Sequence, residues 1–317
     1  RPAGANRMRQ PLPEGLGRLD AHFRCYVEDG RLPFVQLAVT RGGRMAHYAA
    51  MGLRDIDARL PIEDDTLLRI YSMTKPITSV AALMLVERGR VGLDDPVHNY
   101  IPAFAAPRVW VGGTVDKPVT APARNTMTVR DLMRHTAGLS AAREGHPVDE
   151  LYKRRGHIHA GPAGMTLQQA VDDWASLPLL YEPGTNWAYS HATDVLGRVI
   201  EVASGVPLDL FFQREIFDPL GMADTCFRVT PHKLLRLAAL YRQSASSMKR
   251  FGEGEREVVD RDRYLSGCSG LVSTMPDFLR FAEMLRRDGE LDGARLLEES
   301  TVGDMRRNHL PGNIDLA

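Results

Sequence analysis

The apolar residues near the start of the chain are spaced first as in a helix and then as in two strands. Residues 15–28 have apolar side chains at Leu16, Leu19, Phe23 and Tyr26, and Asp29-Gly30 follow directly. This spacing places apolar side chains on one face of a helix. Residues 34–40 and 45–51 are rich in strand-forming and small apolar residues, and they flank a glycine-containing turn at 41–44. We expect a helix over 15–28 and an antiparallel hairpin after it.

A second apolar run begins at Ser72 and ends near Arg88, which predicts a helix buried on most faces. From Asp94 to about Arg261 the pattern changes to helices separated by long connections rich in proline and glycine, without strand alternation. Three later helices are expected to begin after the capping residues Thr128, Thr166 and Ser190. Two more helices are expected over residues 231–241 and 277–287.

These patterns predict an α/β protein of the α+β type, in which an antiparallel sheet is flanked by helices. Residues 1–93 and 262–317 would form a discontinuous α/β lobe, with residues 94–261 as an inserted, mostly helical lobe. A hairpin alone does not make a stable sheet, because three or more covered strands are normally needed. Residues 271–317 show no strand pattern. We therefore expect the C-terminal strands of the sheet to lie beyond residue 317.

Composition argues against several classes of partner. Forty basic and forty acidic residues leave no net charge, so nothing indicates binding to nucleic acid or to an anionic membrane surface. No apolar run is long enough for a membrane anchor. Cys25, Cys226 and Cys268 are too few and too far apart for a disulfide framework or a cysteine metal site. We expect reduced thiols in the cytoplasm; because the chain does not begin with Met, export to the periplasm or beyond stays open.

The sequence Ser72-Met73-Thr74-Lys75 opens the second apolar run. Residues three apart share a helix face, so the lysine amine can reach the serine hydroxyl. The start of a helix favours a developing anion on the serine, and burial favours the neutral amine that a base requires. The alternative is a serine N-cap with a surface lysine. The same pattern recurs at Ser246 and Lys249, in a polar stretch that we interpret as a solvated loop.

Tyr189 is the second candidate group, in a turn sequence that leads into the helix after Ser190. A nearby lysine would push its phenol toward the phenolate, which would take the serine proton and later protonate a leaving group. General acid–base catalysis of this kind contributes about 10²–10⁴-fold in rate. The alternative is an amphipathic tyrosine that packs between two lobes.

Five segments occur in an order and spacing that resemble one superfamily. They are residues 68–76, 85–97, 132–139, 183–191 and 266–274, with the sequences LRIYSMTKP, LVERGRVGLDDPV, LMRHTAGL, PGTNWAYSH and SGCSGLVST. Together they resemble the serine β-lactamase-like superfamily, and most closely its class C-like branch with the family VIII carboxylesterases.

The resemblance implies a serine hydrolase of β-lactamase/transpeptidase-like fold that works through an acyl-enzyme, without metal or cofactor. It implies Ser72 as the acylated nucleophile, Lys75 as its base and Tyr189 as partner base and acid. The Ser72 N–H would be one oxyanion donor. The family's third motif, which goes with the second donor, does not occur before residue 317. The substrate expected is a small or medium-chain carboxylic ester.

Three further residues are candidate substrate contacts. His191 stands two positions after Tyr189, where lactamases and peptidases of this type carry Asn, so an ester is favoured over a lactam. Its alternative role is to fill the first turn of a helix. Trp187 and Trp110, expected on loops near the mouth of the site, would line an acyl pocket or pack internally. We interpret His135 as structural rather than as a base.

Alternative activities within the same superfamily are those of a β-lactamase, a D-amino-acid peptidase or a transacylase. A non-catalytic binding protein on the same scaffold is the alternative from another class.

Overall fold

The computed structural model describes residues 15–143, 145–157, 162, 164–244, 248–251, 258, 264–312 and 314. Contacts divide the chain into two units. Unit 1 comprises residues 1–68, 230–256 and 274–276, and unit 2 comprises residues 69–229, 257–273 and 277–317. The lobe boundaries expected after residues 93 and 261 stay a prediction.

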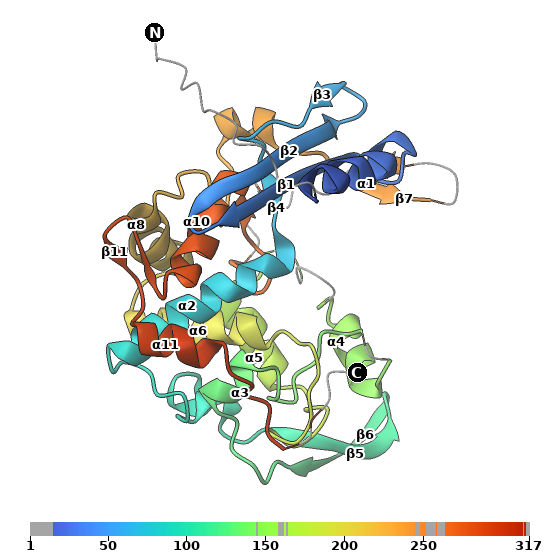
Figure 1. Ribbon diagram of the computed structural model, residues 1–317. Coiled ribbons are helices and arrows are strands. Elements are labelled where there is room, and N and C mark those ends of the chain that lie inside the picture. Colours follow the sequence, from blue (N-terminus) through green and yellow to red (C-terminus); the bar gives the residue numbers. More distant parts are fainter. Residues whose placement is uncertain are drawn as a thin grey trace. The chain divides into compact units, whose positions relative to one another are not determined.

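Unit 1 is built on the predicted hairpin. Strands β1 (Phe34–Arg41) and β2 (Arg44–Asp55) pair antiparallel, and β3 (Leu60–Pro61) pairs with the other edge of β2. Helix α1 (Leu16–Glu28) packs against β1 and β2 (Figure 1). Gly42 and Gly43 have positive φ values of 58° and 77°, which the tight turn requires. The predicted helix and hairpin are therefore confirmed.

The prediction of a helix over residues 231–241 is wrong. Pro231–Arg236 form a 3-10 helix, η5, after which the chain runs extended. The extended part forms hydrogen bonds with other segments: Ala238 N–H donates to Leu67 C=O, and Ala239 N–H donates to Arg54 C=O, each at 2.9 Å. These bonds satisfy backbone groups that a helix would pair internally.

A second, shorter hairpin flanks the second serine–lysine pattern, in the polar stretch that the sequence predicted to be a solvated loop. Strand β7 (Tyr241–Gln243) pairs antiparallel with β8 (Met248–Arg250). Of the second serine–lysine pattern, Lys249 lies in β8, and Ser246 lies outside the described residues.

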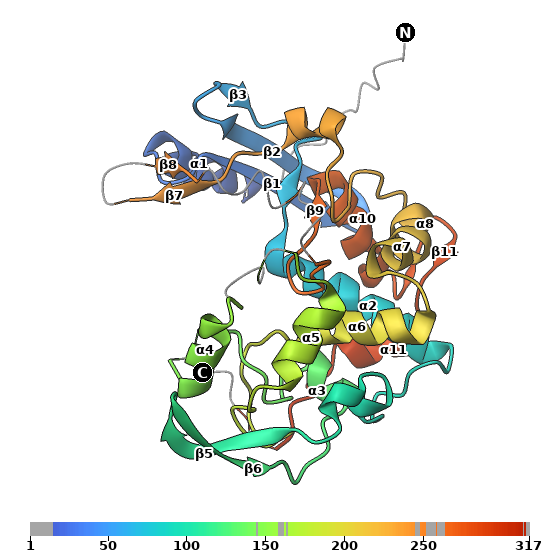
Figure 2. The same cartoon turned by 180° about the vertical axis from the view of Figure 1, so that it is seen from behind.

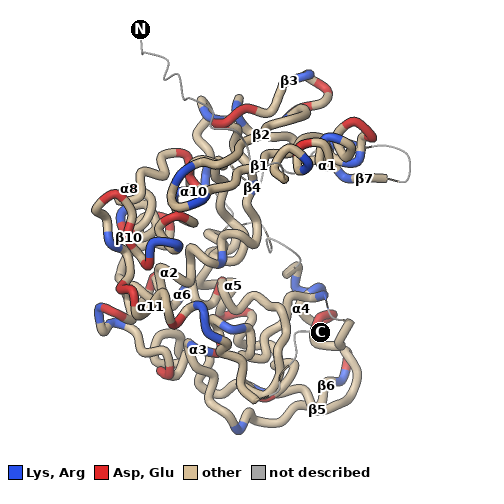
Figure 3. The backbone as a smooth tube through the Cα atoms, in the orientation of Figure 1, with Lys and Arg blue, Asp and Glu red and all other residues tan. Residues whose placement is uncertain are grey.

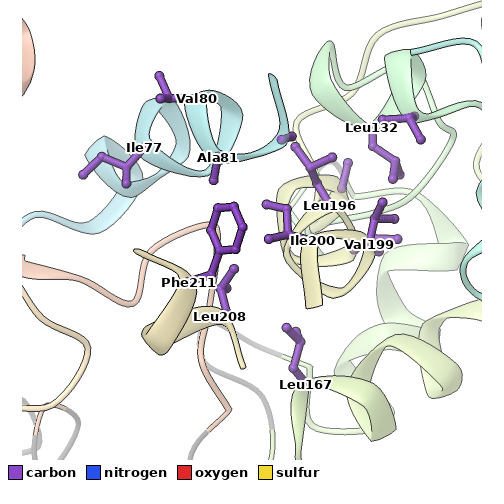
Figure 4. Close-up of a cluster of buried hydrophobic side chains, with 14 of the residues drawn as sticks. Ile77, Val80, Ala81, Leu132, Leu167, Leu196, Val199, Ile200, Leu208 and Phe211 are labelled. Atoms are coloured by element: carbon purple, nitrogen blue, oxygen red, sulfur yellow. The ribbon is translucent and has the colours of Figure 1, made fainter. Parts of the chain in front are cut away.

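The core of unit 2 forms around two helices, α2 (Thr74–Glu87) and α6 (Ala192–Ser204), which pack against each other. Figure 4 shows part of this core, made of Ile77, Val80 and Ala81 from α2, Leu196, Val199 and Ile200 from α6, and the neighbouring Leu132, Leu167, Leu208 and Phe211. All of these side chains are buried. Burial of a Leu, Ile or Phe side chain contributes about 1.5–3 kcal/mol. The cluster therefore anchors α2, the helix that follows Ser72, against α6, the helix that follows Tyr189.

Most of the remaining elements are shorter than α2 and α6 by several residues, and the longest of them is the helix α10 (Figures 1 and 2). They are β4 (Leu68–Arg69), η1 (Tyr71–Met73), η2 (Val97–Asn99), η3 (Pro102–Phe104), β5 (Arg108–Thr114), β6 (Lys117–Pro122), α3 (Val129–Met133), α4 (Pro147–Arg154), α5 (Leu167–Ala175), α7 (Leu208–Phe212), the π-helical η4 (Gln213–Phe217), α8 (Asp218–Leu220), β9 (Val272–Ser273), α10 (Met275–Arg286), β10 (Glu290–Leu291), β11 (Ala294–Arg295) and α11 (Glu299–Met305).

Strands β5 and β6 lie within residues 94–261, where the sequence showed no strand alternation. The two strands pair antiparallel as a separate ribbon. Val111 and Val119 are 59% and 54% exposed, so apolar residues of the ribbon stand at exposed positions and do not give the apolar–polar alternation that marks a half-buried strand. Backbone hydrogen bonds attach the ribbon to the rest of unit 2, since Trp110 N–H donates to Leu179 C=O and Leu179 N–H donates to Arg108 C=O, and the Val109 side chain is buried.

Two of the three predicted helix caps are confirmed. Thr128 and Thr166 each form a capping box at the start of α3 and α5. Ser190 is not the N-cap of the next helix, since α6 begins at Ala192 with His191 at that position. The Ser190 hydroxyl lies instead 3.1 Å from Nδ1 of His135.

The fold is a mixed α/β structure with small antiparallel sheets, as the sequence predicted. Basic and acidic residues are both scattered along the described backbone trace (Figure 3). None of the helices within the described part of the chain has the length and apolar character needed to cross a membrane.

Candidate active site

Ser72 lies on a constrained turn. It belongs to η1, so the α-helix expected from Ser72 begins two residues later, at Thr74. Tyr71 has a positive φ of 43°, which is a strained conformation for a residue with a side chain. Ile70 N–H donates to Leu271 C=O at 3.0 Å and fixes the approach to the turn. These constraints hold the Ser72 hydroxyl in place. Because Ser72 is exposed, the hydroxyl also remains accessible.

The structure brings Ser72, Lys75 and Tyr189 together. Tyr189 Oη lies 2.7 Å from Ser72 Oγ and 2.5 Å from Lys75 Nζ. Lys75 Nζ is farther from the serine, at 3.4 Å from Ser72 Oγ. The phenol oxygen is therefore the shared partner of the hydroxyl and the amine. In this arrangement a proton can pass from Ser72 to Tyr189 along one hydrogen bond while the lysine stays beside the phenol oxygen.

Lys75 has another partner, on the segment around Cys268, whose contact with the lysine the sequence did not predict. Its Nζ donates to the Cys268 carbonyl oxygen at 3.1 Å. Asp194, which is 1% exposed, accepts hydrogen bonds from the Cys268 N–H at 3.0 Å and from the Ser266 hydroxyl at 2.7 Å. Burial of Asp194 opposes its ionisation, but hydrogen bonds from His191, Ser266 and the Cys268 N–H lower its pKa. Asp194 thus holds the segment whose carbonyl binds Lys75.

The segment around Cys268 also packs closely on the helices. A Cβ at Gly267 would lie 2.8 Å from the Thr193 carbonyl oxygen and 3.2 Å from Thr78 Cγ2. The Thr78 hydroxyl donates to the Gly267 carbonyl oxygen at 2.7 Å. Glycine is needed at this position because no side chain fits between the segment and its neighbours.

His191 lies in the core of unit 2 rather than on its surface. It is 7% exposed, and its ring stacks on Trp174 with a centroid distance of 4.6 Å. Its Nδ1 lies 3.1 Å from Asp194 Oδ2. The residue therefore touches the same carboxylate that holds the Cys268 segment. Its predicted role in binding substrate stays a prediction.

Trp187 and Trp110 lie near one surface depression of unit 2. The depression has a volume of about 1160 Å³ and is lined in part by His146, Tyr181 and Trp187. Trp110 was expected on a loop but lies in β5, where its ring makes an edge contact with His146 at 5.8 Å. Trp187 lies on the predicted loop, with its ring edge-on to His135. Their part in acyl binding stays a prediction.

His135 makes a contact that the sequence did not reveal. Its ring stacks on the ring of Tyr189, with centroids 5.0 Å apart and planes inclined by 23°. Burial and the positive charge of Lys75 lower the pKa of His135 to about 4, so the ring is neutral at neutral pH. The sequence signals for these supporting groups were His135 in the segment LMRHTAGL and Asp194, an acidic residue in the first turn of the helix that follows Tyr189.

Within the described part of the chain, no group of three or more His, Cys, Asp or Glu residues is arranged to hold a metal ion.

Comparison with known proteins gives a consistent picture. The sequence model of the beta-lactamase family matches residues 19–315. Protein Rv1367c of Mycobacterium tuberculosis is 36% identical, over 92% of this chain and 71% of that protein. Esterase EstB of Burkholderia gladioli is 33% identical, over 85% of this chain and 69% of that protein.

A solved structure supports the same grouping. EstCE1, described as a hydrolase with promiscuous acyltransferase activity, has a TM-score of 0.80 and 29% sequence identity to this chain. The match covers 92% of this chain and 76% of EstCE1.

Proposed function

The chain belongs to the beta-lactamase family and is a serine hydrolase, and from this premise we propose that Ser72 is the nucleophile that attacks carboxylic esters. The observation that carries the proposal is the position of Tyr189 Oη, within hydrogen-bond distance of both Ser72 Oγ and Lys75 Nζ. Small or medium-chain esters are the proposed substrates, in keeping with the relatives named as esterases.

The first half-reaction forms an acyl-enzyme. Ser72 Oγ attacks the ester carbonyl carbon while its proton moves to Tyr189 Oη. Tyr189 accepts this proton in its phenolate form, which the positive charge of Lys75 beside the oxygen stabilises. Collapse of the tetrahedral intermediate breaks the bond to the alcohol oxygen, and Tyr189 returns the proton to that oxygen. The alcohol leaves, and the acyl group stays on Ser72.

The second half-reaction releases the acid. A water molecule gives its proton to Tyr189 and attacks the acyl carbon, after which the proton returns to Ser72 Oγ and the carboxylic acid leaves. An alcohol in place of water would give a new ester. This second outcome, acyl transfer, is favoured by the likeness to EstCE1, whose title names both activities.

A lactam is the less favoured substrate. The reason is His191, which stands where lactamases of this type carry Asn. Its ring is buried against Trp174 and its Nδ1 is engaged by Asp194. An imidazole held in this way does not offer the side-chain amide that would bind the amide of a β-lactam.

The test is turnover of p-nitrophenyl butyrate compared with the cephalosporin nitrocefin. We expect butyrate hydrolysis with an initial burst of nitrophenol, because a stable acyl-enzyme separates the two half-reactions. Ser72→Ala should abolish turnover, and the matched control Ser246→Ala, in the second serine–lysine pattern, should keep it. Nitrocefin turnover above that of the ester would identify a lactamase instead. Equal rates for wild type and Ser72→Ala would refute the assigned nucleophile.

A cytoplasmic location is part of the proposal. It is supported by Cys25, Cys226 and Cys268, which form no disulfide with one another.

A further inference from the structure

His135 occupies a backbone position that normally takes glycine. It follows α3 and the C-cap residue Arg134, and its φ of 58° lies in the left-handed region. Helices α6 and α8 of the same unit end with Gly205 and Gly221 in this conformation, at φ values of 79° and 65°. Glycine is common there because it has no Cβ to strain the backbone. A histidine at such a position suggests a contact that glycine cannot make.

His135 contacts three consecutive residues of the segment that carries Tyr189. The His135 carbonyl oxygen accepts a hydrogen bond from the Ala188 N–H at 3.1 Å. Its ring stacks on the Tyr189 ring, and its Nδ1 lies 3.1 Å from the Ser190 hydroxyl. The backbone contact would persist in glycine, whereas the two ring contacts depend on the imidazole.

We propose that His135 is a positioning residue that holds the Tyr189 phenol between Ser72 and Lys75. This inference rests on the proposed function. The phenol oxygen has to stay within hydrogen-bond distance of both partners, and a displacement of about 1 Å can cost up to 10²-fold in rate. A ring stacked at 5.0 Å restricts rotation of the phenol about its side-chain bonds, and the bond to Ser190 fixes the plane of the stacking ring.

The chemistry of His135 fits positioning rather than proton transfer. The lowered pKa, about 4, keeps the ring neutral at the pH where esters are cleaved. A neutral ring adds no second positive charge beside Lys75. The imidazole contacts Ser190, Tyr189 and Trp187, whereas the Ser72 hydroxyl has Tyr189 and Lys75 as its partners.

The test compares His135→Gly with wild type by the rate at which a fluorophosphonate labels Ser72, followed by intact mass spectrometry. Glycine relieves the left-handed backbone, so the variant should fold. We expect labelling and kcat for an ester to fall by about 10–100-fold with KM nearly unchanged. Arg59→Gly, which relieves another left-handed residue in unit 1, is the matched control and should label at the wild-type rate. His135→Asn, which also tolerates this conformation, is the second variant.

A double-mutant cycle with Tyr189→Phe separates positioning from a general structural effect. If His135 acts through the Tyr189 phenol oxygen, adding His135→Gly to the Tyr189→Phe variant should change the rate of Ser72 labelling by less than about twofold. Equal labelling of His135→Gly and wild type, or fully additive losses in the cycle, would overturn the inference while leaving the proposed nucleophile intact. Absence of a Ser72 adduct on the wild type would overturn both.

Discussion

Replacing Tyr189 by Phe removes one oxygen atom from the centre of the site. That oxygen is the nearest partner of Ser72 Oγ, at 2.7 Å, and the amine of Lys75 is 3.4 Å from the serine. If Tyr189 takes the serine proton, its loss should lower kcat by about 10²–10⁴-fold. This corresponds to about 3–5 kcal/mol of transition-state stabilisation, since each tenfold change is about 1.4 kcal/mol.

The fold should survive this change. Lys75 keeps the Cys268 carbonyl oxygen as a partner at 3.1 Å, and the phenylalanine ring can still stack on His135. The free energy of unfolding should therefore fall by only about 1–3 kcal/mol, because the change removes two hydrogen bonds, one of them to the amine of Lys75. KM for the ester should stay nearly constant, because the phenol oxygen acts on the serine proton rather than on ground-state binding.

The assay is single-turnover acylation by p-nitrophenyl butyrate, with urea unfolding on the same samples. Tyr100→Phe is the control, because it also removes a phenol oxygen from unit 2, one that donates to Asp95 at 2.5 Å. It should acylate at the wild-type rate. An acylation rate of Tyr189→Phe within threefold of wild type, in a folded protein, would refute Tyr189 as the proton acceptor and leave Lys75 as the direct base.

Three further changes test the surroundings of the site. Asp194→Asn weakens the hold on the Cys268 segment, and we expect a loss of about 1–3 kcal/mol in urea unfolding together with a lower kcat. Gly267→Ala places a Cβ 2.8 Å from the Thr193 carbonyl oxygen, and thermal unfolding should show a loss of about 1–3 kcal/mol. The pKa of His135 falls from 6.5 to about 4 on folding, so the unfolded chain binds more protons in this range. The unfolding free energy should decrease as the pH falls from 6.5 to 4, by about 3 kcal/mol at most, and His135→Asn should remove this part of the slope in pH-dependent urea titrations.

Local patterns predicted the elements whose own residues determine them. The helix over 15–28, the hairpin with glycines at its turn and the capped starts of α3 and α5 all follow from short-range spacing, and all are present. The serine–lysine pair was found for the same reason, since three residues of helix bring both groups to one face. For this pair only the start of the helix differed from the prediction, because Ser72 lies in a 3-10 turn and the α-helix begins at Thr74.

Features that depend on partners distant in sequence were missed. The expected helix after Pro231 gives way to extended backbone, because Ala238 and Ala239 pair with residues near 67 and 54. The β5–β6 ribbon has exposed valines and so lacks the alternation that would reveal it. The hydroxyl of Ser190 was assigned to a helix cap, but its partner is His135, 55 positions earlier in the chain. No single-segment pattern contains these pairings.

The most direct test of the central claim is peptide mapping of the protein after reaction with a fluorophosphonate or a slowly hydrolysed ester. The account predicts one adduct, on the peptide that contains Ser72, and its disappearance in Ser72→Ala. An adduct on another serine, or none on a folded wild-type protein, would contradict the assignment of Ser72 as the nucleophile.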